Sequence, residues 1–104
     1  DQDPSGGDAV YVPFFGRPAH SLTSTHSLAR LSGAAVVFYR HVRREDGGYT
    51  LTLTPAPEPY PTADATADTA TVMAGIEDMA RAAPDQYLWI HRRFKRQPDG
   101  GSLY

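Results

Sequence analysis

Residues 65–83, ATADTATVMAGIEDMARAA, carry the clearest periodicity in this chain of 104 residues. Apolar side chains recur there every three or four positions, which is the spacing of one face of an α-helix. Asp64 or Asp68 lies near the expected amino end, where the helix dipole favours a carboxylate, and Pro84 closes the segment. The stretch predicts an amphipathic helix whose apolar face consists of Thr69, Val72, Met73, Ile76, Met79, Ala80 and Ala83.

Two β-rich runs precede this helix. Residues 34–42 carry apolar side chains on both faces, with Val36 and Phe38 on one side and Val37 and Tyr39 on the other, which favours an interior strand. Residues 49–54 alternate Tyr or Leu with Thr, the period-2 pattern of a strand with one polar face. Residues 43–48, RREDGG, supply a turn, so we expect an antiparallel β-hairpin.

The remaining segments are shorter. Residues 10–12 predict a strand that runs into a loop, and residues 21–31 predict a helix that stops at Ser32 and Gly33. Residues 55–61 are a Pro-rich connector. After Pro84 the pattern allows a second helix or a short strand over residues 87–90, and we expect the helix. The expected fold class is α/β: a strand, a helix, a β-hairpin contributing to a mixed sheet, and two carboxyl-terminal helices.

Composition limits the function classes. The chain is 40% hydrophobic and 21% charged, as expected for one small globular domain with a thin core. Its net charge of -2 argues against nucleic-acid binding through net charge, and the absence of cysteine excludes disulfides, thiol nucleophiles and Cys-based zinc sites. No apolar run reaches the length of a membrane span. Residues 1–4, DQDP, open the chain without an initiator methionine, so we expect a fragment of a longer protein.

Several titratable residues invite a search for catalytic pairs. His41 and Asp46 have an H-x4-D spacing, in which a carboxylate can orient a histidine base. His41 falls at the end of the expected strand and Asp46 falls in the turn that follows. Water should solvate both side chains there, so we interpret the pair as non-catalytic. His20 and His26 lie on different faces of the expected helix and do not complete a metal site. We expect neither a metal nor a cofactor.

Residues 87–96, YLWIHRRFKR, form the most unusual segment, because they hold the single Trp and four of the ten basic residues. We name them the basic–aromatic segment. Aromatic and basic side chains in alternation suit a membrane interface, a phosphate, an acidic partner or single-stranded nucleic acid. They also suit a core in which Trp89 and Phe94 are packed while arginine heads reach water. Residue types alone leave these alternatives open.

Four stretches in this chain occur in the order and spacing of a known family. They are residues 1–4, DQDP; residues 12–16, VPFFG; residues 82–87, AAPDQY; and residues 87–95, YLWIHRRFK, with a Trp-x-His-Arg-Arg signature. Together they resemble the bacterial lipid A biosynthesis acyltransferases, the lauroyl and myristoyl transferases, over essentially the whole chain. One departure is residues 34–39, AAVVFY, where family members commonly carry a proline.

The resemblance implies that residues 1–104 are the carboxyl-terminal part of a single domain with a glycerolipid-acyltransferase-like fold, bound to the cytoplasmic face of the inner membrane. The amino-terminal anchor and the catalytic His-x4-acid pair would lie outside this chain, which alone would be inactive. The implied reaction transfers a fatty acyl group from acyl carrier protein to a hydroxyacyl chain of a Kdo-bearing lipid A precursor. The implied substrate-binding residues are Asp1, Asp3, Arg17, Arg92, Arg93 and Lys95.

A non-catalytic binding module is the alternative. In that case the basic–aromatic segment docks an anionic lipid or an acidic protein, and binding weakens as salt is added. Binding of single-stranded nucleic acid is disfavoured by the net charge of -2. If the chain is the fragment that the resemblance implies, its sheet is cut in two, and the apolar residues Val36, Phe38, Leu51 and Leu53 lack their neighbours.

Overall fold

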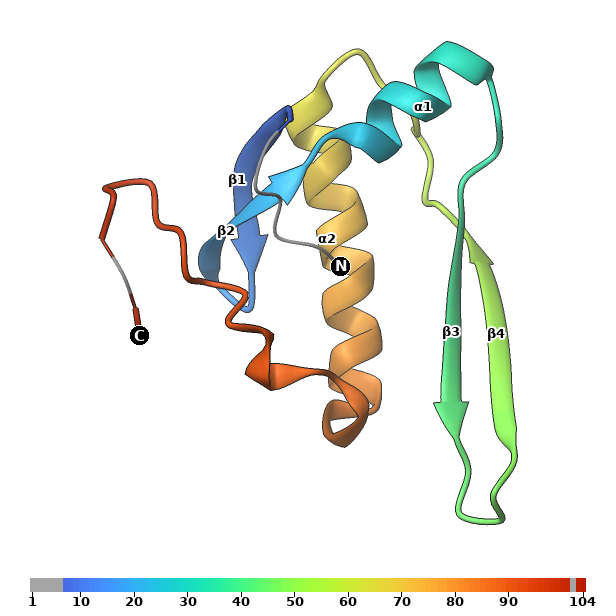
Figure 1. Cartoon of the computed structure of the whole chain (residues 1–104). Helices are drawn as coiled ribbons and strands as arrows, with labels where there is room; N and C mark the ends of the chain where they lie inside the picture. Colours follow the sequence, from blue (N-terminus) through green and yellow to red (C-terminus); the bar gives the residue numbers. More distant parts are fainter. Residues whose placement is uncertain (1–6, 102) are drawn as a thin grey trace.

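The computed structural model describes residues 7–101 and 103–104, and these form two antiparallel two-stranded sheets and two α-helices. In chain order the elements are β1 (Ala9–Phe14), β2 (Arg17–Leu22), α1 (Ser24–Ser32), β3 (Val37–Arg43), β4 (Tyr49–Pro55) and α2 (Ala65–Ala82). Two 3₁₀ turns follow, η1 (Pro84–Gln86) and η2 (Trp89–His91). Helix α2 lies between the two sheets, and α1 crosses near its amino end (Figure 1). No described helix is long and apolar enough to cross a membrane.

The prediction of an amphipathic helix over residues 65–83 is confirmed. Asp64 caps it by accepting hydrogen bonds from the N–H groups of Thr66 and Ala67 at 3.0 and 3.1 Å, which satisfies two donors that a helix start leaves open. The helix ends at Ala82, two residues before Pro84. Its apolar face packs on β1 and β2, and the small buried core that results consists of Val12, Phe14, Ala19 and Met73.

Strand β2 is an element that the sequence pattern did not predict. A two-residue turn at Phe15 and Gly16, both with positive φ, folds β2 back on β1 so that Phe14 lies opposite Arg17. A positive φ is rare for an aromatic residue, and α2 stabilises it here. The Phe15 N–H donates to the Glu77 carboxylate, and the Arg81 guanidinium lies 4.6 Å from the centre of the Phe15 ring.

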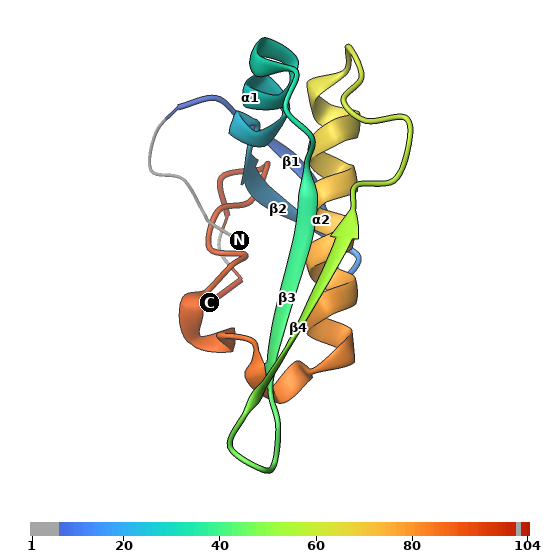
Figure 2. The same ribbon diagram turned by 90° about the vertical axis from the view of Figure 1, so that its right-hand side faces the viewer.

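The predicted hairpin over residues 34–54 is confirmed as β3–β4, with Tyr39 opposite Leu53. The face of the hairpin that carries Tyr39, Leu51 and Leu53 points away from α2, so these side chains are 60%, 60% and 64% exposed. Figure 2 shows the hairpin running alongside α2. Within the described residues β3 has one partner strand, so residues 34–42 do not form the interior strand that we predicted. Both sheets in these residues are antiparallel, so the predicted mixed sheet is not seen there either.

The prediction of a second carboxyl-terminal helix is wrong, and the alternative strand over residues 87–90 does not form either. In the described residues after α2 the chain makes only the turns η1 and η2, with Tyr87 extended and Arg92 left-handed at φ 55°. The side chains of this segment do not share one face, because Phe94 packs on the core while Ile90 points to water. Tertiary contacts therefore override the helical spacing.

Candidate functional site

The basic–aromatic segment is held against the β1–β2 sheet by aromatic contacts. The ring of Phe14 lies 5.9 Å from that of Tyr87 and 6.0 Å from that of Phe94, measured between centroids. The Trp89 ring lies 5.5 Å from the Phe15 ring, and its indole N–H donates to the Pro84 carbonyl at 2.7 Å. Tyr87, Trp89 and Phe94 thus hold the segment against the sheet, which positions the basic residues between and after them.

Arg93 is buried, with only 3% of its surface exposed. Its guanidinium donates to the His20 carbonyl at 2.6 Å and to the Ser21 hydroxyl at 2.8 Å, both on β2. A buried cation is tolerated only when such partners satisfy it. Arg93 therefore fastens the basic–aromatic segment to β2 and does not face solvent in this structure.

The other implied substrate-binding residues that the structure describes are exposed. Arg17 begins β2 beside a hollow that Pro98 also lines, while Arg92 and Lys95 flank the buried Arg93. The Arg92 guanidinium lies 5.8 Å from the centre of the Tyr104 ring. The side chains of these three cations are exposed to solvent. Asp1 and Asp3 lie outside the described residues.

His41 and Asp46 are engaged separately. The His41 ring stacks on Tyr39 at 5.9 Å on the exposed face of the hairpin. The Asp46 carboxylate accepts hydrogen bonds from the Gly48 N–H at 2.8 Å and from Arg44 at 3.1 Å, and these bonds, the Gly48 one above all, lower the pKa of Asp46. The carboxylate thus stabilises the hairpin turn rather than orienting the histidine.

Sequence reasoning missed a pair of His26 and Asp68. His26 Nδ1 lies 2.6 Å from the Asp68 carboxylate, which is 1% exposed and also accepts hydrogen bonds from the N–H and hydroxyl of Thr62. Burial acts to raise the pKa of Asp68, but the hydrogen bonds from Thr62 and His26 together lower it. The two residues are far apart in sequence, so no local signal could have found this link between α1 and α2. The described residues contain no cluster of three or more potential metal ligands.

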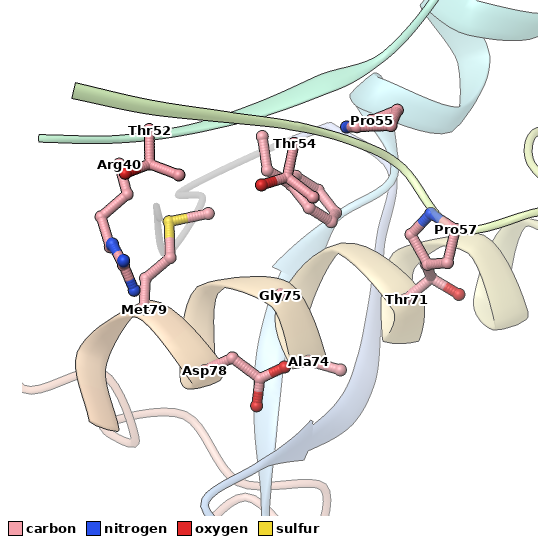
Figure 3. Close-up of a pocket in the computed structure, with 11 residues that line it drawn as sticks. Arg40, Thr52, Thr54, Pro55, Pro57, Thr71, Ala74, Gly75, Asp78 and Met79 are labelled. Atoms are coloured by element: carbon pink, nitrogen blue, oxygen red, sulfur yellow. The ribbon is translucent and has the colours of Figure 1, made fainter. Parts of the chain in front are cut away.

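A cleft of about 510 Å³ separates the hairpin from α2 (Figure 3). Its α2 wall is mainly apolar, with Ala74, Gly75 and Met79, and its hairpin wall carries Thr52 and Thr54 around the Phe38 ring. Arg40 and Asp78 line the same cleft. A Cβ at Gly75 would come within 2.6 Å of the Phe38 ring, so a larger residue here would force that ring to shift. The apolar wall of the cleft can bind a hydrocarbon segment, while the threonine hydroxyl groups of the cleft form hydrogen bonds to polar atoms of the same ligand.

Comparison with known proteins agrees with the motifs in this chain. The chain is 45% identical to the lipid A biosynthesis palmitoleoyltransferase of Escherichia coli K12 and 42% identical to the lauroyltransferase of that organism, over 100% and 96% of its length. A lipid A biosynthesis acyltransferase of Haemophilus influenzae is 32% identical over 95% of the chain. The chain spans about a third of the length of these relatives, 35%, 33% and 33% respectively.

The first two relatives are named for different acyl groups although their identities to this chain are nearly equal. Overall similarity of this segment therefore does not specify the acyl group. The family model described as bacterial lipid A biosynthesis acyltransferase matches residues 1–96, which include every described residue of the basic–aromatic segment and of α2. The chain belongs to the bacterial lipid A biosynthesis acyltransferase family.

Proposed function

We propose that the protein containing this chain transfers a fatty acyl group from acyl carrier protein to the hydroxyl of a hydroxyacyl chain on a Kdo-bearing lipid A precursor, at the cytoplasmic face of the inner membrane. The observation that carries the proposal is the family match over residues 1–96. In this proposal the described residues are the carboxyl-terminal part of a glycerolipid-acyltransferase-like domain.

The proposed reaction needs three kinds of group. A histidine removes the proton of the acceptor hydroxyl, whose oxygen attacks the thioester carbonyl, and the C–S bond breaks to release the carrier thiol with a proton. Hydrogen-bond donors stabilise the oxyanion that forms at the carbonyl. Cations bind the phosphates and sugar acids of the acceptor. We place the histidine and its orienting acid outside residues 1–104, so these residues supply only the third kind of group.

Two roles are proposed for the basic residues. Arg17, Arg92 and Lys95 are exposed and are proposed to bind anionic groups of the lipid precursor or of the carrier protein. Arg93 is proposed to position this surface, because its guanidinium binds the chain's own β2 strand. Asp1 and Asp3, which lie outside the described residues, remain proposed substrate-binding residues.

The test is acyl transfer by the purified full-length protein, with acyl carrier protein charged with a fatty acid as donor and a Kdo-bearing lipid A precursor as acceptor. We expect the acceptor mass to rise by that of one acyl group, and we expect the variant His41→Ala to retain this activity. Absence of a mass change with a panel of acyl donors would overturn the proposal. Loss of activity in His41→Ala with normal folding would overturn the interpretation of His41 as non-catalytic.

Docking to anionic lipid without catalysis is a second candidate function. Leu88 and Ile90 are 65% and 84% exposed and lie close in sequence to the exposed Arg92 and Lys95, an arrangement suited to a lipid surface. Vesicle sedimentation distinguishes the two candidates. Salt-sensitive binding to vesicles that contain phosphatidylglycerol, combined with no acyl transfer, would favour the binding module.

A further inference from the structure

Among the described residues, strand β3 is paired with β4 along one edge and has no partner strand along the other, which we call the open edge. The Ala56 N–H donates to the Val36 carbonyl at one end of the hairpin, and the Arg44 N–H donates to the Gly48 carbonyl at the other. Because an antiparallel ladder uses every second residue, the backbone groups of residues 36, 38, 40, 42 and 44 point toward β4. Those of Val37, Tyr39, His41 and Arg43 point toward the opposite edge.

Gln86 occupies one end of this open edge. The Arg43 N–H donates to Gln86 Oε1 at 2.8 Å, and Gln86 Nε2 donates to the Arg43 carbonyl at 3.1 Å. These are the two hydrogen bonds that a residue of a neighbouring strand would make. In the part of the chain that the structure describes, the matching backbone groups of Val37, Tyr39 and His41 have no such partner.

A groove of about 580 Å³ runs along the open edge. Residues 36–42 form one wall, and the apolar side chains Val72, Ile76 and Met79 of α2, together with Ala83 just after that helix, form the floor. Gln86 lies at its end. The groove thus offers backbone hydrogen-bonding groups beside an apolar surface, which are the two things that a β-strand in the core of an α/β domain needs.

We propose that a β-strand from the part of the protein outside these 104 residues pairs with residues 37–41 of β3, places its apolar side chains on α2 and stops at Gln86. This inference rests on the proposed function only in assigning the chain to a longer protein. The relatives have about three times the length of this chain, so their remaining length can supply such a strand. An unpaired edge that carries apolar residues on both faces is otherwise prone to aggregate.

Two proline variants of the full-length protein test the proposal. Tyr39→Pro removes an N–H on the open edge of β3, and Leu53→Pro removes the equivalent N–H on the outer edge of β4, directly opposite and equally exposed. Tyr39→Ala and Leu53→Ala correct each proline variant for its lost side chain. We expect Tyr39→Pro to lower the midpoint of thermal unfolding by about 5 °C more than Leu53→Pro, after that correction. Equal shifts would overturn the proposal.

Hydrogen exchange in the unmodified full-length protein gives a second readout that does not depend on a variant folding. We expect the amides of Val37, Tyr39 and His41 to be protected to within about tenfold of those of Phe38 and Arg40. Exchange at the rate of an open loop would overturn the proposal, and protection that falls on dilution would instead assign the edge to a second copy of the chain. Acyl transfer is measured separately, so a protected edge in a protein without activity would refute the proposed function alone.

Discussion

Replacing Arg93 with methionine tests whether this basic residue positions the chain or faces a ligand. The variant keeps an apolar stem but loses the hydrogen bonds to the His20 carbonyl and the Ser21 hydroxyl. Bonds of this charged kind contribute about 1.5–3 kcal/mol each, and with 3% exposure there is little water to replace them. We expect the free energy of unfolding to fall by about 3–5 kcal/mol.

The assay is equilibrium urea unfolding of the full-length protein, with Arg92→Met as a matched control. Arg92 is the adjacent, exposed arginine, so its loss should change the free energy of unfolding by less than about 1 kcal/mol. Arg93→Lys should fall between the two, because an ammonium group cannot reproduce the planar fork of a guanidinium. If Arg93→Met costs no more than Arg92→Met, the assignment of Arg93 as a buried anchor is wrong.

Three further outcomes are expected. The folded-state pKa of Asp68 is lowered from 3.8, so the ionised carboxylate stabilises the fold at neutral pH, and this stabilisation is lost as the pH falls through the folded-state pKa. In urea unfolding, Asp68→Asn should therefore be less stable than the unmodified protein at pH 7, and its stability should change less as the pH is lowered. An unchanged dependence of stability on acid pH would contradict this. Gly75→Val should cost about 1–3 kcal/mol because its Cβ meets Phe38, whereas the exposed Ala74→Val should cost less than about 1 kcal/mol. Arg17→Ala should raise KM for the proposed lipid precursor by up to about tenfold and leave the thermal midpoint unchanged, and a KM equal to that of the unmodified protein would remove Arg17 from the proposed substrate-binding residues.

Local patterns were sufficient to predict α2 and the β3–β4 hairpin. The helix follows from side chains three and four residues apart, a carboxylate cap at Asp64 and a proline beyond the end. The hairpin follows from alternation on both sides of a Gly-rich turn. Each of these signals acts between residues close in sequence, so reading it needs no knowledge of the rest of the fold.

Strand β2 and the path of the basic–aromatic segment could not be predicted in this way. Strand β2 depends on a left-handed Phe15, which is stabilised by Glu77 and Arg81 from a helix far along the chain. The basic–aromatic segment has helical spacing, but Arg93 is bound at β2, so the chain turns where a helix would continue. In both places a long-range contact outweighs the small preference of the local sequence.

The sequence by itself determined the family, because four motifs in a fixed order can be recognised without coordinates, and it determined the elements whose signals are local. Only the tertiary structure decided which basic side chains are accessible. Arg92, Arg93 and Lys95 are near neighbours with similar charge, yet Arg93 alone points into the protein. It also decided that, in the part of the chain that the structure describes, the edge of β3 beside α2 has no partner strand. Burial and pairing depend on what lies opposite a residue in space, and neighbours along the chain do not specify that.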